Sequence, residues 1–327
     1  MSEVRVQMVK QPTVISMFAG CGGSSLGYKL AGFRELLAVE WDDNAVETFK
    51  LNFPDVPVYH GDIAKLTGSE CMELAGIEKG ELDVLDGSPP CQGFSTAGKR
   101  KFDDPRNSLF AEYARLIDEL QPRVFVMENV TGMVKGYMKQ AYLQCIKTLR
   151  ECGYKAKGQV LNAKYYNVPQ SRERVIIIGV RNDLGMEPSH PKPQTKPMSS
   201  RNYVIGEGIP LPSKYIETWK HTKPGETFFE GRNRMGVKPH SFDAQVLDPR
   251  KPAPTIKKQI RIGQSGLHHW ERTEILNIES IKMLTSFPIE YNFTGKWQEQ
   301  WARIGNSVPP NLMRAIAEHI KNNILKV

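Results

Sequence analysis

Residues 14–23, VISMFAGCGG, decide the fold, because an apolar run of strand type stops there at a glycine-rich turn. The amphipathic segment 24–30 follows directly, so the sequence predicts a strand, a tight turn and a helix. Glycines let a backbone turn sharply and approach a ligand closely, and a helix N-terminus offers free N–H groups. The turn therefore favours a nucleotide-like cofactor. Its spacing is not the G-x-G-x-x-G of dinucleotide enzymes, and a turn that binds nothing is the alternative.

The same alternation of strand and helix continues to about residue 180. Short runs rich in valine, isoleucine and leucine are predicted strands at Val14–Phe18, Leu36–Glu40, Val56–Tyr59, Leu82–Asp86, Val124–Glu128 and Val175–Val180. Apolar residues at helical spacing lie between them, at Ser24–Leu30, Asn44–Asn52, Ser108–Leu120 and Ala141–Glu151. Repeated β-α units predict an α/β protein with a Rossmann-like, doubly wound and mostly parallel sheet.

The sequence changes in character after Gly185, where proline and lysine become frequent and periodicity is weak through Pro254. We therefore expect a first domain of residues 1–187, a small loop-rich domain of residues 188–275, and a return segment of residues 276–327. In the return segment, Asn311–Leu325 is a predicted amphipathic helix that packs back on the first domain.

The net charge of +8 is carried mostly by the second half of the chain. Residues 1–181 hold 23 basic and 22 acidic side chains, whereas residues 182–327 hold 21 and 14. Within residues 192–261 there are 14 basic and 6 acidic side chains, with aromatic residues interleaved. Such a segment is typical of a surface that binds a polyanion, and a solvated basic surface without a ligand is the alternative.

Cysteine usage and hydropathy indicate the compartment. The five cysteines include no C-x-x-C pair, and the first residues lack the apolar stretch of a signal peptide. The most apolar run, residues 175–180, is far shorter than the roughly 20 residues that span a bilayer. We therefore expect a cytoplasmic protein with no membrane segment.

Acidic residues follow the second and third predicted strands. Glu40 ends the second strand, where a carboxylate commonly accepts hydrogen bonds from ribose hydroxyls, and Trp41 comes next. Asp62, after the third strand, stands where a carboxylate can accept from an adenine amino group. Each acid alone is more typical of a helix cap or a turn. Together they coincide with the strand ends where ligands of open α/β sheets bind.

Cys91 follows the fourth predicted strand, in residues 86–95, DGSPPCQGFS. A single free cysteine is most often a small buried apolar residue. Here the sequence is polar, and the basic residues 99–101 favour the thiolate that a nucleophile needs. Glu128 ends the fifth strand, so its carboxyl group is expected at the same edge of the sheet as Cys91.

Two arginines, Arg172 and Arg174, precede and enter the sixth predicted strand. They alternate with Glu173, so both are expected on one face of the strand. There they can converge on one anionic site, and surface salt bridges are the alternative.

Five runs of sequence resemble, in their order, the motifs of the DNA cytosine-5 methyltransferases. They are residues 18–23 (FAGCGG), 89–92 (PPCQ), 128–130 (ENV), 170–174 (QSRER) and 305–309 (GNSVP). The resemblance covers essentially the whole chain. One region departs from it: the family often has Arg-Glu-x-x-Arg before Gly-Phe-Pro, and only Phe287 and Pro288 of that pattern are present. The boundary of the recognition domain is therefore open.

The resemblance implies a function and a set of site residues. Cys91 would attack carbon 6 of a flipped-out cytosine, Glu128 would contact N3 and the exocyclic amine, and Arg174, together with Arg172, would help to hold the ring. S-adenosylmethionine would donate the methyl group to carbon 5 and become S-adenosylhomocysteine, with no metal required. The implied cofactor residues are Phe18, Gly20, Gly22, Gly23, Glu40, Trp41, Asp62, Ile63, Pro89, Asn306 and Ser307.

The implied partner is double-stranded DNA of a specific sequence, recognised by residues 188–275, and the protein is expected to be a monomer that can act beside a restriction endonuclease. A tRNA cytosine-5 methyltransferase is the nearest alternative, but its Cys-Phe-Thr signature is missing. A DNA-binding module without turnover is a second, and the filled catalytic positions argue against it. An adenine or cytosine amino methyltransferase is disfavoured by Cys91 and Gln92.

Overall fold

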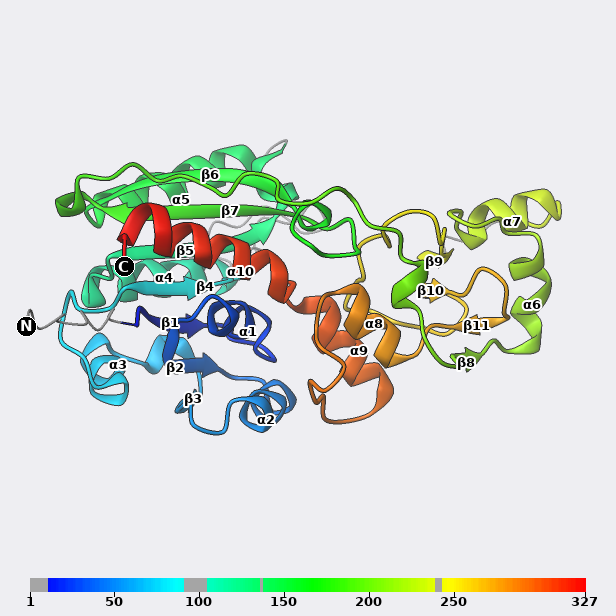
Figure 1. Cartoon of the computed structure of the whole chain (residues 1–327), viewed down its shortest axis with the longest axis horizontal. Coiled ribbons are helices and arrows are strands. Elements are labelled where there is room, and N and C mark those ends of the chain that lie inside the picture. The colour runs from blue at the N-terminus through cyan, green and yellow to red at the C-terminus, as the bar shows by residue number, and fades with distance from the viewer. Residues whose placement is uncertain (1–10, 91–104, 136–137, 239–242) are drawn as a thin grey trace, which may run out of the picture.

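The computed structural model describes residues 11–90, 105–135, 138–238 and 243–327. In these residues the chain forms two β-sheets, which lie at opposite ends of an elongated molecule (Figure 1). The larger sheet is layered between helices, whereas the smaller sheet lies among loops and two short helices.

The larger sheet has seven strands in the order β3-β2-β1-β4-β5-β7-β6. Their bounds are β1 Thr13–Met17, β2 Arg34–Glu40, β3 Val58–His60, β4 Val84–Gly87, β5 Val124–Val130, β6 Tyr154–Asn162 and β7 Glu173–Arg181. The strands from β3 to β5 pair in parallel, and β7 pairs antiparallel with both β5 and β6. The predicted α/β architecture with a mostly parallel sheet is confirmed.

Helices cover both faces of this sheet. They are α1 Gly23–Leu30, α2 Asp43–Asn52, α3 Gly68–Ala75, α4 Pro105–Leu120, α5 Met138–Glu151 and α10 Pro310–His319, and the last continues into a π-helical turn, η7 Ile320–Leu325. Because α1 and α10 approach closely, Gly27 is required: a Cβ there would lie 2.6 Å from Cβ of Met313 and 2.7 Å from the carbonyl oxygen of Pro310. Residues 310–319 therefore pack directly on α1, and their assignment to the first domain stays a prediction.

The smaller sheet has the order β8-β11-β10-β9, with β8 Ile209–Pro210, β9 Asp243–Val246, β10 Ser265–His268 and β11 Glu274–Ile275. Helices α6 Ser213–Lys220 and α7 Phe228–Arg234 pack beside it, and α8 Ile278–Leu284 and α9 Trp297–Asn306 lead back to the larger sheet. Short 3₁₀ turns occur at Ile63–Lys65, Thr131–Val134, Ala163–Tyr165, Asn182–Leu184 and Arg201–Tyr203. The domain division at residues 187 and 275 stays a prediction.

Two elements of the first half were absent from the sequence prediction. Strand β6 carries Lys155, Lys157 and Gly158, and several of its residues are exposed because it lies at the sheet edge, where lysine is common. Helix α3 is short and buries only Gly68 and Cys71, so its apolar periodicity is weak. No helix in the described ranges is long and apolar enough to cross a membrane.

Candidate active site and cofactor-binding edge

The carboxyl ends of β1, β2, β4 and β5 meet at one edge of the larger sheet, because these strands are parallel. The edge brings together the turn after β1, Glu40, Pro89 and Glu128. Cys91 lies outside the described residues, which reach Pro90 and resume at Pro105. Its role as nucleophile therefore stays a prediction, and the structure describes the strand ends on which the other predicted site residues lie.

The turn after β1 has the backbone of a close-approach loop. Phe18, Gly20 and Gly22 have positive φ angles of 56°, 57° and 89°. At Gly22 a Cβ would lie 2.6 Å from the Phe53 ring and 2.7 Å from the hydroxyl of Tyr291, so glycine is needed for packing. At Gly20 nothing lies within 4 Å of the Cβ position, which leaves the backbone open on that side.

Glu40 fastens this turn to the end of β2. Its carboxylate accepts hydrogen bonds from three main-chain N–H groups, those of Gly20 at 2.8 Å and of Trp41 and Asp42 at 2.9 Å each. Trp41, the next residue, is 77% exposed, so its indole is open to solvent. The carboxylate of Glu40 therefore joins the ends of β1 and β2, and the exposed indole of Trp41 follows it.

Two predicted cofactor residues, Asp62 and Ile63, follow β3, and they lie in different surroundings. Asp62 accepts a hydrogen bond from the N–H of Ala64 at 3.0 Å and so caps the short turn that follows. Ile63 is buried in the core of the larger sheet. The cap is the alternative that the sequence left open for Asp62, and the cofactor role of both residues stays a prediction.

The segment at the end of α9 lies against the glycine turn. The hydroxyl of Ser307 donates to the carbonyl oxygen of Arg303 at 2.8 Å and lies 2.9 Å from the thiol sulfur of Cys21. At Gly23 a Cβ would lie 2.5 Å from the carbonyl oxygen of Val308, so this glycine allows the contact. Burial raises the pKa of Cys21 to about 11, which keeps this thiol neutral. Asn306 is exposed beside it.

Glu128 and Arg174 form an ion pair at the end of β5. The guanidinium Nε of Arg174 donates to Oε1 of Glu128 at 2.7 Å, and only 13% and 11% of the two side chains are exposed. Strands β5 and β7 pair in the register that places Val130 opposite Arg174. Because a charge-assisted bond in a shielded place is strong, the carboxyl group of Glu128 has a fixed direction.

Arg172 has different partners from Arg174. It is buried and donates through one Nη1 group to the carbonyl oxygens of Ile256 at 3.1 Å and Gly305 at 3.0 Å. Burial, and then the nearby charge of Arg174, lower the pKa of Arg172 to about 9. The two arginines therefore do not share one acceptor here: Arg172 ties the sheet to the return segment, and its catalytic role stays a prediction.

Asn129 was not among the predicted site residues, although it stands beside Glu128 in a quoted motif. Its side-chain amide donates to the carbonyl oxygen of Pro89 at 3.0 Å and accepts from the N–H of Val130 at 2.9 Å. Asn129 therefore holds the exit of β4, two residues before Cys91, at a fixed distance from Glu128. The motif contains Asn129, but its contact with Pro89 joins residues 40 positions apart, which no local sequence pattern indicates.

The profile of one protein family, described as C-5 cytosine-specific DNA methylase, matches residues 12–322 of this chain. The chain belongs to this family. The methylase is 35% identical to the Type II methyltransferase M1.HphI of Haemophilus parahaemolyticus, over 94% of its own length and 86% of that relative. It is 31% identical to the Type II methyltransferase M.XorII of Xanthomonas oryzae, over 97% and 86% of the two chains.

Solved structures share the fold of the methylase. The Entamoeba histolytica methyltransferase EhMeth matches with a TM-score of 0.73 at 17% identity, over 97% of this chain and 99% of that one. A protein named as a DNA modification methyltransferase from an Escherichia coli prophage matches with a TM-score of 0.74 at 24% identity, over 95% and 99%. The predicted family and fold are confirmed: the chain is a DNA cytosine-5 methyltransferase, and its family implies S-adenosylmethionine as methyl donor and DNA as substrate.

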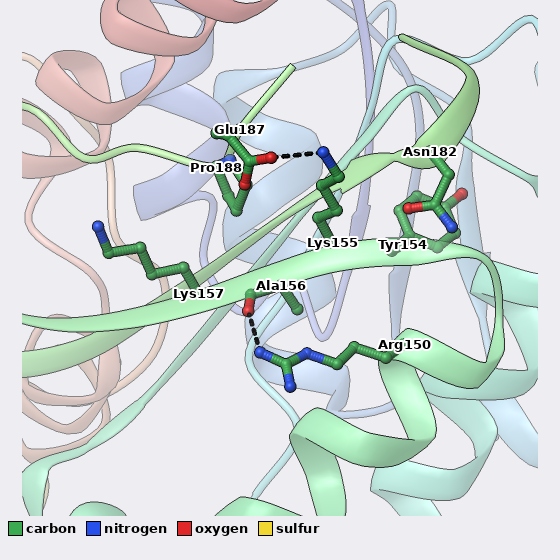
Figure 2. A pocket seen from close by; sticks show the side chains of 8 residues that line it. All are labelled: Arg150, Tyr154, Lys155, Ala156, Lys157, Asn182, Glu187 and Pro188. Carbon is green, nitrogen blue, oxygen red and sulfur yellow. Dashed lines mark hydrogen bonds and ion pairs between the residues drawn. The ribbon is translucent and has the colours of Figure 1, made fainter. Parts of the chain in front are cut away.

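A cavity of about 700 Å³ in the methylase lies away from this site (Figure 2). It is lined by Arg150, Tyr154, Lys155, Ala156, Lys157, Asn182, Glu187 and Pro188. Tyr154 begins β6 and pairs with Arg181, while Val180 pairs with Val124 at the start of β5, so the cavity lies at the amino edge of the sheet. No predicted site residue lines it, and Lys155 is paired there with Glu187. The cavity therefore lies at the edge of the sheet opposite to the predicted site residues.

Within the described ranges, no group of three or more histidine, cysteine, aspartate or glutamate side chains is arranged to hold a metal ion. The acidic residues at the carboxyl edge of the methylase have other partners: Glu40 accepts from main-chain amides, and Glu128 pairs with Arg174.

Proposed function

We propose that this methylase modifies carbon 5 of a flipped-out cytosine in a specific double-stranded DNA sequence, through a covalent bond between Cys91 and carbon 6. The observation that carries the proposal is the pair of contacts at the end of β5. Arg174 orients the carboxyl group of Glu128, and Asn129 holds Pro89 just before Cys91. Contacts at the end of β5 thus fix the carboxyl group of Glu128 and the main chain at Pro89, two residues before Cys91.

The covalent route follows from the chemistry of the ring. Carbon 5 of cytosine is a weak nucleophile until the Cys91 sulfur adds to carbon 6 and electron density moves toward carbon 5. A hydrogen bond or proton from Glu128 to N3 stabilises the charge that develops. Once carbon 5 has taken the methyl group, a base removes the carbon 5 proton and the Cys91 sulfur leaves, which restores the aromatic ring.

The residues at the ends of β1 and β2 fit S-adenosylmethionine. Gly20 leaves the main chain open, Glu40 is held with its carboxylate toward the turn, and Trp41 offers an uncovered indole face to an adenine. Phe18, Gly22, Gly23, Pro89, Asn306 and Ser307 complete the proposed shell, with Asp62 and Ile63 at its rim. When bound, the cofactor supplies an electrophilic methyl group, and no metal is needed.

We propose that residues 188–275 choose the DNA sequence. They include the smaller sheet and the exposed basic residues Lys257, Lys258 and Arg261. Phosphate contacts would supply affinity and a few base-edge contacts the choice of sequence. Exposed large apolar side chains are scattered over separate elements, which supports a monomer. The Type II names of the relatives support action beside a restriction endonuclease.

Trapping on 5-fluorocytosine tests the covalent route directly, because fluorine cannot leave carbon 5 as the proton does. After bisulfite sequencing of plasmid DNA from expressing cells has identified the target, a duplex with 5-fluorocytosine at that position is mixed with the protein and S-adenosylmethionine. We expect a complex that survives denaturant with the natural chain and none with Cys91→Ala. Absence of the complex with an active natural chain would show that the route is not covalent.

A further inference from the structure

Arg303, in α9, reaches across to the turn that follows β2. Its Nη2 group donates to Oδ2 of Asp42 at 2.9 Å, and 14% and 34% of the two side chains are exposed. The other oxygen of Asp42 caps α2 by accepting from the N–H of Ala45 at 3.0 Å, and the N–H of Asp42 donates to Glu40. Asp42 is thus hydrogen-bonded to Glu40 and directly follows Trp41 in the chain.

The main chain of Arg303 contacts the other half of the cofactor edge. Its carbonyl oxygen accepts from the hydroxyl of Ser307 at 2.8 Å and from the thiol of Cys21 at 3.7 Å. One residue of the return segment therefore contacts the turn after β1 through its carbonyl group and the turn after β2 through its side chain.

Helix α9 is itself held firmly. Trp301 is buried, and its indole N–H donates to the carbonyl oxygen of Lys257 at 3.1 Å. At Gly305 a Cβ would lie 2.5 Å from the same oxygen, so the helix end packs directly on that main chain. The backbone of Arg303 is consequently held in place. Its guanidinium can therefore fix the position of Asp42.

We propose that Arg303 is a positioning residue for S-adenosylmethionine: by holding Asp42, it keeps Glu40 and Trp41 in the arrangement that receives the nucleoside. The inference rests on the proposed function of the carboxyl edge. Without the guanidinium, Asp42 would keep its cap on α2 but lose the ion pair that ties the turn after β2 to α9. The turn that carries Glu40 and Trp41 would then be held less firmly against α9, and the cofactor would bind more weakly.

The chain offers a matched control at the other edge of the sheet. Arg123 and Asp83 form an ion pair with the same length, 2.9 Å, and similar shielding, with 29% and 6% of the side chains exposed. Asp83 also accepts from the N–H of Thr13, at the start of β1 and so at the amino edge. Arg123→Gln removes an ion pair of the same kind without touching the cofactor edge.

The test measures the Kd of S-adenosylhomocysteine by calorimetry, without DNA, for Arg303→Gln, Asp42→Asn, the double variant and Arg123→Gln. Asparagine keeps the α2 cap. We expect Kd to rise roughly tenfold in each of the first two, and no further in the double variant, because both remove one interaction. Arg123→Gln should stay within about twofold of the natural chain.

Kinetics supply the second readout. In Arg303→Gln, KM for S-adenosylmethionine should rise while kcat at saturation stays within about twofold, since the reacting groups are untouched. An unchanged Kd in Arg303→Gln, or an equal rise in Arg123→Gln, overturns the proposal. A natural chain that fails to bind S-adenosylhomocysteine would instead contradict the proposed cofactor site, so the two failures are distinguishable.

Discussion

The two sheets of the molecule are built in opposite ways. In the larger sheet β5 has 7 residues and β7 has 9, and β1 and β4 are buried throughout. In the smaller sheet the strands have 2 to 4 residues, and its separate apolar cluster consists of Leu211, Phe228, Ala244 and Val246. A large core holds catalytic groups in place, whereas the short strands and loops around the smaller sheet tolerate changes at their surface. We therefore expect chemistry and the proposed target choice to vary independently.

The largest effect should come from the larger sheet. Cys91→Ala should lower methylation by roughly 10⁴-fold or more, because it removes the nucleophile, and should leave S-adenosylhomocysteine binding unchanged. Bisulfite sequencing measures the first and calorimetry the second. Retention of more than about one per cent of the natural rate would show that catalysis does not depend on this thiol.

Exchange of residues 192–270 for the matching segment of a relative should redirect methylation. Because base-edge contacts carry the choice, the new target should be preferred over the old one by roughly 10³-fold, while Cys91 and Glu128 continue to act. Bisulfite sequencing of the whole plasmid reads both targets at once. If the exchanged protein still methylates the old target, the target is recognised by the part that holds the larger sheet. The proposed separation of chemistry from target choice would then be wrong.

Neutralising Lys257, Lys258 and Arg261 together should weaken binding to cognate and random duplexes alike. Each phosphate contact that is lost should reduce the slope of log affinity against log salt by about 0.9. Binding isotherms over a range of salt measure this slope. Neutralising Arg150, Lys155 and Lys157, which line the cavity at the amino edge, is the control and should change little (Figure 2). Equal effects of the two triple variants would indicate attraction by net charge alone.

The two parts of the molecule should also differ in how the free energy of unfolding depends on pH. Burial, with Glu35 nearby, raises the pKa of Asp86 in β4 to about 8, despite hydrogen bonds from Ser24 and Tyr28. The folded pKa is above the unfolded value, so stability from this group is full below about pH 4 and falls as pH rises toward 8, by up to about 1.4 kcal/mol per pH unit. Asp86→Asn should remove that fall, as measured by urea unfolding from pH 5 to pH 8.

Asp248, just after β9, should have the opposite sign. Arg250 holds the pKa of this carboxyl below its ordinary value. Its contribution is therefore present above the unfolded pKa and is lost as pH falls through the folded pKa. Asp248→Asn should flatten the acid limb of the same unfolding curves and leave the alkaline limb unchanged. If Asp86→Asn and Asp248→Asn change the same part of the curve of unfolding free energy against pH, the two carboxyl groups do not have opposite pKa shifts.

The larger sheet could be predicted from the sequence because its signals are local. The run Val175–Val180 is apolar enough to mark β7, and Glu40 and Glu128 follow from the rule that parallel strands end at one edge. Strand β6 was hidden by its lysines. Long-range contacts could not be predicted: Arg172 bonds residues 84 and 133 positions away, and no local pattern encodes such partners.

The packing of α10 on α1 has a consequence for synthesis of the chain. Gly27 and the face around it are made early, but the residues that cover them, 310–319, are made only after the whole smaller sheet. Until then the helix that follows the glycine turn exposes Tyr28, which is buried in the finished core. The first half of the nascent chain therefore keeps apolar surface uncovered until residues 310–319, nearly 300 positions later, have been translated. At common rates of synthesis, about 5–20 residues per second, that interval lasts tens of seconds, long enough for a chaperone to bind.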